Sequence, residues 1–100
     1  MIKHIVMFKF ADNALGNTKA ENLIKAKEML DALLSVVPSL KAMKVSIDLG
    51  QVNTNFDLVL ESDFVCAADL QEYIIHPEHQ KVGQFIRAVF TDRACVDYEF

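Results

Sequence analysis

The order of apolar patterns along the chain predicts an α+β fold whose elements follow one another as β-α-β-β-α-β. Residues 2–10 alternate between two faces, which is typical of a strand. Two amphipathic helical regions follow, the first from residue 18 and the second from about residue 66. Two strand patterns separate these helical regions, and a third closes the chain. Paired in this order, the strands form one sheet with both helical regions on a single side.

The first strand, residues 2–10, is apolar on both faces at its middle. One face carries Ile2, His4, Val6, Phe8 and Phe10. The other face carries Lys3, Ile5, Met7 and Lys9. A strand that is apolar on both sides is typical of the centre of a sheet, where both faces are covered. Charges interrupt the apolar residues and no small-residue cleavage site follows, so this segment is predicted to be a strand and not a signal peptide.

A helix is predicted to begin at Thr18. Thr18 stands three residues before Glu21, which is the spacing of a capping box. Pro38 is expected to end the helix, because the residue before a proline avoids helical angles. The expected apolar stripe consists of Ala20, Leu23, Ile24, Leu30, Leu33, Leu34 and Val37.

Three more strands are expected, over residues 42–49, 56–61 and 93–100. The order of all elements is that of the ferredoxin-like split arrangement, in which the first and third strands are central and the other two form the edges. Both helical regions then cover one face of the sheet. The other face needs a cover, which the sheet of a second subunit would supply.

The second helical region is predicted to contain a break. A helical stretch begins near Cys66, and its inner side carries Leu70, Tyr73 and Ile74. The His76–Pro77 step interrupts it, and Pro77 is well placed as the first residue of a further helix. The apolar stripe of that helix consists of Val82, Phe85, Ile86 and Val89.

Length and composition point to one domain, residues 1–100. A chain of this length is too short to bury two separate cores. Its apolar content of 52% is slightly high for so small a body. The surplus agrees with an apolar sheet face that a second copy of the chain covers, and we therefore expect a homodimer.

Charge and cysteine content exclude several classes of function. The net charge is −4 and no basic cluster occurs, which argues against nucleic-acid and anionic-membrane partners. No apolar run approaches the ~18 residues that a membrane span requires. Cys66 and Cys95 are too few for a disulfide framework, so free thiols in a reducing cytoplasm are expected. No phosphate loop or flavin fingerprint is present, and no cofactor is expected.

The three histidines and one tyrosine are the candidate functional residues. His4 lies on an otherwise apolar strand face and must find a partner if it is buried. Either His4 is a satisfied core histidine and His76 is a helix cap, or His4 is part of a site with His79. His79 would be the third residue of its helix, where the positive end of the helix dipole opposes protonation and leaves an imidazole that can accept a proton. Tyr73 could donate a hydrogen bond to a carbonyl oxygen, or it is a half-buried aromatic with its hydroxyl at the surface.

Metal binding and thiol chemistry are the remaining possibilities. The His76-x-x-His79 spacing contains a proline and lacks an obvious third ligand, so no metal is expected there. Cys66 stands at a helix start, where a thiol can be reactive, although such a cysteine is more often a small apolar filler.

Four segments resemble the stress-responsive α/β-barrel (Dabb) family. They are Lys3–Phe10 (KHIVMFKF), Phe56–Phe64 (FDLVLESDF), Leu70–His79 (LQEYIIHPEH) and Val96-Asp97-Tyr98. The Tyr-x-x-His-Pro-x-His motif within the third segment is the most specific, and the resemblance covers essentially the whole chain. It implies a ferredoxin-like subunit that dimerises through its sheet into a dimeric α+β barrel.

The resemblance also implies roles for individual residues. The best-understood activity of the family is that of olivetolic acid cyclase, a cofactor-free polyketide cyclase that closes a poly-β-ketoacyl thioester by aldol condensation. By this resemblance His79 is the base that removes the α-proton, and Tyr73 holds the carbonyl oxygen of the substrate. His4 lines the same pocket and hydrogen-bonds to His79. Phe8, Phe85 and His76 are expected to be pocket or structural residues.

Three functions stay open at this point. The first is a small dimeric stress-response protein whose pocket, between sheet and helices, holds a small apolar or acyl ligand without turnover. The second is an acid–base enzyme of the cyclase type that uses His79 and Tyr73. The third is a cofactor-free monooxygenase, which shares the dimeric barrel fold.

Overall fold

A four-stranded antiparallel sheet forms one layer of the structure, a computed structural model that describes residues Met1–Phe100. Its strand order is β4–β5–β1–β6. The strands are β1 (Ile2–Phe10), β4 (Ala42–Ile47), β5 (Leu58–Phe64) and β6 (Phe90–Glu99). The predicted ferredoxin-like arrangement is confirmed, because the first and third long strands, β1 and β5, are the central ones.

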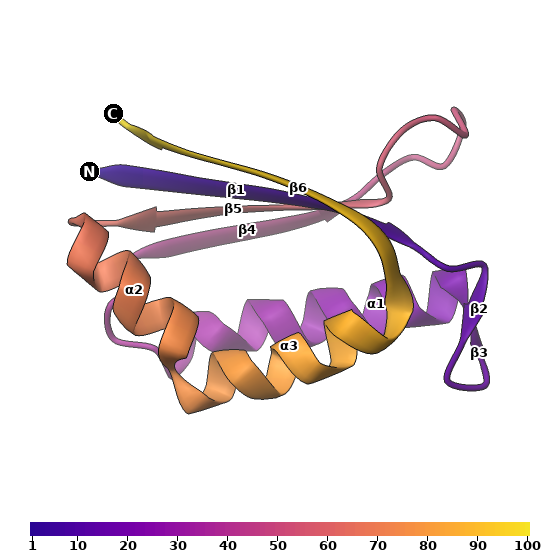
Figure 1. The fold of residues 1–100 in the computed structure, drawn as a ribbon, viewed down its shortest axis with the longest axis horizontal. Helices are drawn as coiled ribbons and strands as arrows, with labels where there is room; N and C mark the ends of the chain where they lie inside the picture. The colour runs from indigo at the N-terminus through magenta and orange to yellow at the C-terminus, as the bar shows by residue number, and fades with distance from the viewer.

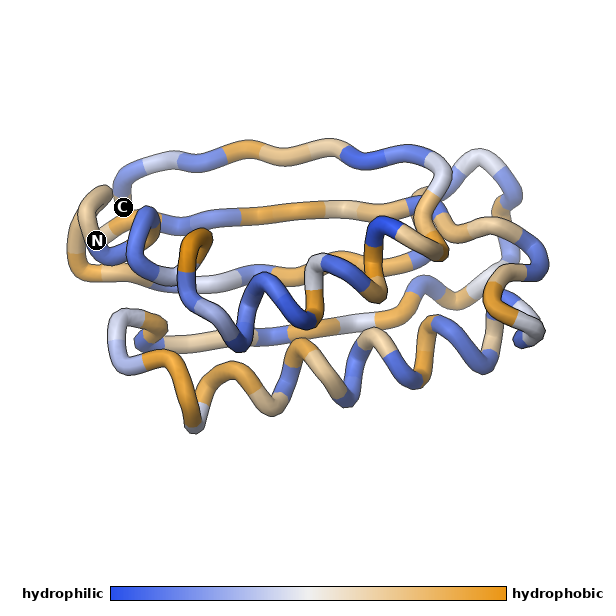
Figure 2. Tube along the Cα trace, turned by 60° about the horizontal axis from the view of Figure 1, so that its bottom comes forward, coloured by the Kyte–Doolittle hydropathy of each residue, from blue (hydrophilic) through white to orange (hydrophobic).

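Three helices form the second layer. They are α1 (Lys19–Asp31), α2 (Ala67–Ile75) and α3 (Pro77–Val89). All three lie on the same side of the sheet, with α1 and α3 running beneath the strands (Figure 1). The residues along these helices alternate between hydrophobic and hydrophilic (Figure 2), and their apolar sides join the sheet in a core of 19 buried residues. No helix is long and apolar enough to cross a membrane.

The predicted capping box opens α1. The backbone N–H of Glu21 donates to Oγ1 of Thr18 at 3.3 Å, and the Thr18 N–H donates to Oε1 of Glu21 at 3.0 Å. The predicted end at Pro38 is wrong, because α1 stops at Asp31 and a 3-10 turn, η1 (Ala32–Ser35), follows.

The predicted apolar stripe of α1 is only partly correct. Ile24 and Leu34 are exposed, as is Ala20. Asn22 and Ala26 occupy buried positions instead, and Nδ2 of Asn22 donates to the Ala14 carbonyl at 3.1 Å. The backbone carbonyl satisfies the amide nitrogen of this buried polar residue, whereas its Oδ1 has no hydrogen-bond partner.

The predicted boundaries of three strands are also wrong. The strand expected at 56–61 lies at Leu58–Phe64, because its polar residues are satisfied within the sheet. Ser62 donates to the His4 carbonyl at 3.2 Å, and Asp63 pairs with Nζ of Lys3 at 2.7 Å. The strand expected at 42–49 ends at Ile47, and the last strand begins directly after α3 at Phe90, before its predicted start at residue 93.

The segment between β1 and α1, expected to be a loop, contains a small hairpin. Its strands are β2 (Asn13–Ala14) and β3 (Asn17–Thr18). The two turn residues both have positive φ, 54° for Leu15 and 78° for Gly16. A two-residue hairpin turn of this kind matches the twist of the strands, but it places a leucine in the left-handed region.

The break between α2 and α3 is confirmed. Pro77 is the first residue of α3, and His76 is its N-cap, with Nδ1 accepting a hydrogen bond from the Glu78 N–H at 3.1 Å. Ile74, expected on the inner side of α2, is exposed, whereas Leu70 and Tyr73 are buried. The change of direction at this proline brings the last residues of α2 against the first turn of α3 (Figure 1).

No element of the chain covers the second face of the sheet. On this face Ile5 of β1 is the register partner of Glu61 on β5 and of Val96 on β6. Met7 is the register partner of Val59 on β5 and of Ala94 on β6. The loop between β4 and β5 rises on this side, at the end of the sheet away from the two chain termini (Figure 1). We call this surface the open sheet face.

Candidate functional site

A cavity of about 300 Å³ lies between the sheet and α3. His4 from β1, Tyr73 from α2 and His79 from α3 all line it, so the structure brings the three predicted residues together. Phe8 also lines the cavity, as expected for a pocket residue. His76 and Phe85 do not line it, because His76 caps α3 and Phe85 packs in the core.

Tyr73 is the most deeply buried of these side chains. Only 1% of its surface is exposed, and its hydroxyl has no hydrogen-bond partner. The interpretation as a half-buried aromatic with a surface hydroxyl is therefore wrong. Burial raises the pKa of Tyr73, so the phenol stays protonated and can act as a donor.

His79 lies against Tyr73, with the two ring centroids 4.3 Å apart. Nδ1 of His79 lies 3.0 Å from the Ile74 carbonyl oxygen. Because a carbonyl oxygen only accepts, Nδ1 carries the proton, and Nε2 of the neutral ring is the free base.

The pKa of His79 is lowered mainly because burial disfavours the charged ring. The bond to the Ile74 carbonyl opposes this shift, and His4, Arg87 and Arg93 add to it by charge repulsion. The direction agrees with the sequence-based expectation, although burial, and not the helix dipole, is the main cause. A neutral imidazole in an apolar cavity can accept a proton from a bound molecule.

His4 does not hydrogen-bond to His79, contrary to expectation. Its Nδ1 bonds the carboxylate of Asp97, and Sγ of Cys95 lies 3.7 Å from the same nitrogen. The reason is strand register, since Asp97 of β6 is the direct neighbour of His4 on β1. His4 is buried and meets Tyr73 edge-on, with their ring centroids 6.4 Å apart.

His4, Cys95 and Asp97 form the one group of metal-compatible side chains. Their donor atoms lie within 4.8 Å of one another, and nitrogen, thiolate and carboxylate donors are those that zinc accepts. Neither His76 nor His79 belongs to this group, so the His-x-x-His spacing does not form a shared site. Burial and then the nearby Asp97 raise the pKa of the Cys95 thiol, which keeps it protonated.

Sequence reasoning missed two arginines of the cavity, Arg87 and Arg93. Arg87 follows His79 by two helical turns, a spacing that places both on one helix face and could have indicated it. Arg93 lies near the start of β6 and is the register partner of Phe8 on β1, and both residues line the cavity. No sequence signal pointed to it.

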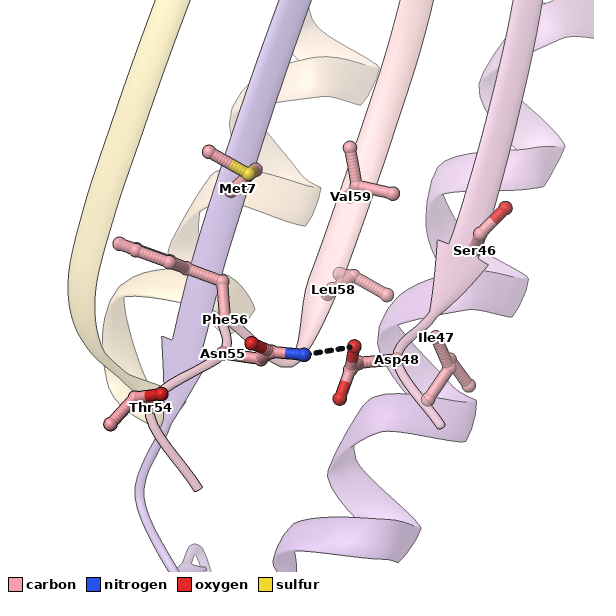
Figure 3. A pocket seen from close by; sticks show the side chains of 9 residues that line it. All are labelled: Met7, Ser46, Ile47, Asp48, Thr54, Asn55, Phe56, Leu58 and Val59. Carbon is pink, nitrogen blue, oxygen red and sulfur yellow. Dashed lines mark hydrogen bonds between the residues drawn. The ribbon is translucent and has the colours of Figure 1, made fainter. Parts of the chain in front are cut away.

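A larger cavity, of about 470 Å³, lies on the open sheet face. Figure 3 shows Met7, Val59 and Ser46 on three neighbouring strands, with Asn55 and Phe56 of the loop at one end of them. Its one charged residue is Asp48, which already accepts hydrogen bonds from the Gly50 N–H and from the Asn55 side chain. No histidine, tyrosine or cysteine lines this cavity, so its greater size does not make it the candidate site.

The family model of the stress responsive A/B barrel domain matches residues 2–100. The chain belongs to this family. The match spans both central strands, the helices that frame the smaller cavity and the edge strands. The family assignment expected from the Tyr-x-x-His-Pro-x-His motif is thus confirmed.

Individual relatives include proteins with and without a described activity. Olivetolic acid cyclase from Cannabis sativa is 27% identical over 97% of this chain and 94% of its own length. A dimeric protein of unknown function with a ferredoxin-like fold, from Bacteroides fragilis, is 31% identical with a TM-score of 0.88. That comparison covers 99% of this chain and 95% of the other.

A further solved structure shares the fold at lower sequence identity. A protein proposed to be an antibiotic biosynthesis monooxygenase, from Nitrosomonas europaea, has a TM-score of 0.77 over 100% of this chain and 98% of its own. Its sequence is only 15% identical, so the likeness shows a common fold alone.

Proposed function

We propose that the protein binds a small acyl ligand in the cavity beside His79 and removes an α-proton from it, in a cyclase-like acid–base reaction. The observation that carries this proposal is the buried, unpartnered hydroxyl of Tyr73 beside the ring of His79. A buried hydroxyl without a partner is unfavourable, and a carbonyl oxygen of a ligand would supply the missing acceptor. The relationship to olivetolic acid cyclase supports the same chemistry.

His79 and Tyr73 account for the protons and charges that move in the proposed reaction. Nε2 of His79 takes the α-proton, and the electrons of the broken C–H bond move toward the neighbouring carbonyl oxygen. Tyr73 donates a hydrogen bond to the enolate oxygen that forms. The enolate carbon then attacks a second carbonyl of the same chain, and the resulting alkoxide takes the proton back from His79.

The test is the exchange of α-protons in heavy water. A β-ketoacyl N-acetylcysteamine thioester is incubated with the protein, and deuterium uptake at its α-carbon is followed by NMR above the buffer background. We expect His79→Gln and Tyr73→Phe to lower the protein-dependent rate of deuterium exchange. For His79→Gln, which removes the base, the decrease should be about 100-fold or more.

The control variant is His76→Asn. Asparagine is a good N-cap, so this variant keeps the start of α3 while removing the neighbouring imidazole. Wild-type activity is expected. If the wild-type protein binds the thioester without accelerating deuterium exchange, the acid–base proposal is wrong. Ligand binding without turnover is then the remaining function.

We further propose that the chain, as a single domain of residues 1–100, forms a homodimer through its open sheet face. Met7 is 37% exposed and Val96 is 54% exposed at the middle of this face, where no helix covers them. Apolar surface of this kind is typical of an interface. The B. fragilis relative is described as dimeric, which supports the proposal.

A cytoplasmic location is proposed from the thiols. Cys66 and Cys95 are both exposed and unpaired, as expected for a reducing compartment. Fractionation of cells that express the protein, with the oxidation state of both thiols measured by alkylation, tests this location.

A further inference from the structure

Two arginines, Arg87 and Arg93, are the only ones in the chain, and both line the cavity that holds His79. Arg87 comes from α3 and Arg93 from β6, so two separate elements bring a guanidinium to one place. Both side chains are exposed, which puts them on the solvent side of the cavity. None of the lysines lines it. The chain is acidic overall, yet its two most versatile anion-binding side chains converge here.

Neither guanidinium is neutralised by the protein itself. Every ion pair of the structure involves a lysine or His4, and no carboxylate pairs with Arg87 or Arg93. No aspartate or glutamate lines the cavity either. Arg93 also interacts with the Cys95 thiol, but with no carboxylate paired to it each guanidinium can still offer its planar set of donors, which fits the two oxygens of a carboxylate.

Gly83 gives Arg87 its position. A Cβ at Gly83 would lie 3.2 Å from Nη1 of Arg87 and 3.8 Å from its Cζ, so the guanidinium lies back against the helix one turn earlier. Gly83 lines the cavity as well. Glycine in the middle of a helix is unfavourable compared with alanine, and the space it leaves for Arg87 is the packing reason for it here.

Apart from the two arginines, His4, His79 and Gly83, the residues that line the cavity are hydrophobic. Its walls include Val6 and Phe8 of β1, Leu60 of β5 and Ile86 of α3. A ligand that fits both the apolar walls and the two arginines has an apolar body and one anionic end. We propose that the cavity binds a small amphipathic carboxylate, with its acyl chain between the sheet and α3 and its carboxylate held by Arg87 and Arg93. This inference rests on the proposed ligand pocket and specifies the class of ligand.

The experiment compares octanoate with octanamide, which has the same shape and no charge. Binding is followed by two-dimensional amide NMR, with the signals of Gly83 and His79 as reporters of the cavity, at a pH where octanoate is ionised. We expect octanoate to bind about tenfold more tightly than octanamide, since charge-assisted hydrogen bonds exceed neutral ones in strength. We expect Arg87→Gln and Arg93→Gln each to remove most of that preference.

Lys81→Gln is the matched control. Lys81 lies on α3 like Arg87, carries the same charge and does not line the cavity, so its loss should leave the preference unchanged. If the two compounds bind equally well, or if the preference for octanoate persists in both arginine variants, Arg87 and Arg93 do not hold the carboxylate. The proposal that the cavity binds a ligand is not affected by that result. If neither compound shifts the NMR signals of the cavity residues, both the proposed ligand binding in the cavity and the proposed role of the two arginines are wrong.

Discussion

Burial sets the chemical state of the two central side chains. The phenol of Tyr73 stays protonated because burial raises its pKa, and the imidazole of His79 stays neutral because burial lowers its pKa. Each side chain therefore holds the form that a proton-transfer pair requires, one as a donor and the other as a base. The cavity achieves this with no carboxylate in its lining.

The titration of His79 provides the first prediction. We expect NMR to show a folded-state pKa below 6.5, because burial disfavours the charged ring and His4, Arg87 and Arg93 repel it. The energetic penalty for protonating the folded state is absent above pH 6.5, grows as the pH falls below that value and levels off below the folded-state pKa. Stability should thus decrease on acidification through this window, and less so in His79→Gln. A pKa above 6.5 would contradict the role of His79 as a base.

A second prediction concerns Leu15 in the hairpin turn. Its φ of 54° is unfavourable for a leucine, whose side chain is exposed and gains little from packing. Leu15→Asn should raise the free energy of unfolding by up to about 1 kcal/mol, because asparagine tolerates this conformation. Urea unfolding measures the change. Leu49→Asn, an exposed leucine outside the hairpin, should show no gain.

Among the elements, α1 owes its start to interactions within a few residues. Thr18 and Glu21 satisfy one another's backbone N–H groups, which would otherwise lack partners at the first turn. The hydrogen bonds from Thr18 to the Glu21 carboxylate lower the pKa of Glu21, so the box persists well into the acidic range and is lost as the pH falls through that lowered pKa.

Thr18→Ala tests this cap. We expect a loss of about 1 kcal/mol in the free energy of unfolding, the usual effect of removing a threonine N-cap. Thr91→Ala removes a threonine whose hydroxyl makes only a long 3.4 Å bond to the Lys9 carbonyl, and it should cost less. Equal losses in the two variants would argue against a special role for the cap.

At the scale of the whole molecule, the open sheet face is the surface through which we propose that the chain dimerises. Met7 and Val96 are exposed at its middle, and Phe56 of the loop between β4 and β5 lies at one end of it (Figure 3). A second sheet packed there would remove this apolar surface from water. The cavity of His79 lies on the opposite side of the sheet, so pairing leaves it accessible.

Met7→Lys tests the dimer. An ammonium group without a partner in an apolar interface is expensive to desolvate, so sedimentation at micromolar concentration should show a dimer for the wild type and a monomer for this variant. Ile24→Lys, which changes an exposed residue on α1, should remain dimeric. A monomeric wild-type protein at that concentration would refute the proposal.

The sequence by itself determined the order of elements, the capping box at Thr18 and the break at Pro77, because these depend on interactions between residues a few positions apart. It also singled out Tyr73 and His79, which share one short motif. Only the tertiary structure decided that β5 extends to Phe64, that His4 bonds Asp97 instead of His79, and that Arg87 and Arg93 meet at one cavity. His4 and Asp97 are 93 residues apart, and their contact depends on the register of two strands. Local patterns do not encode that register, because it is set by the packing of the whole sheet.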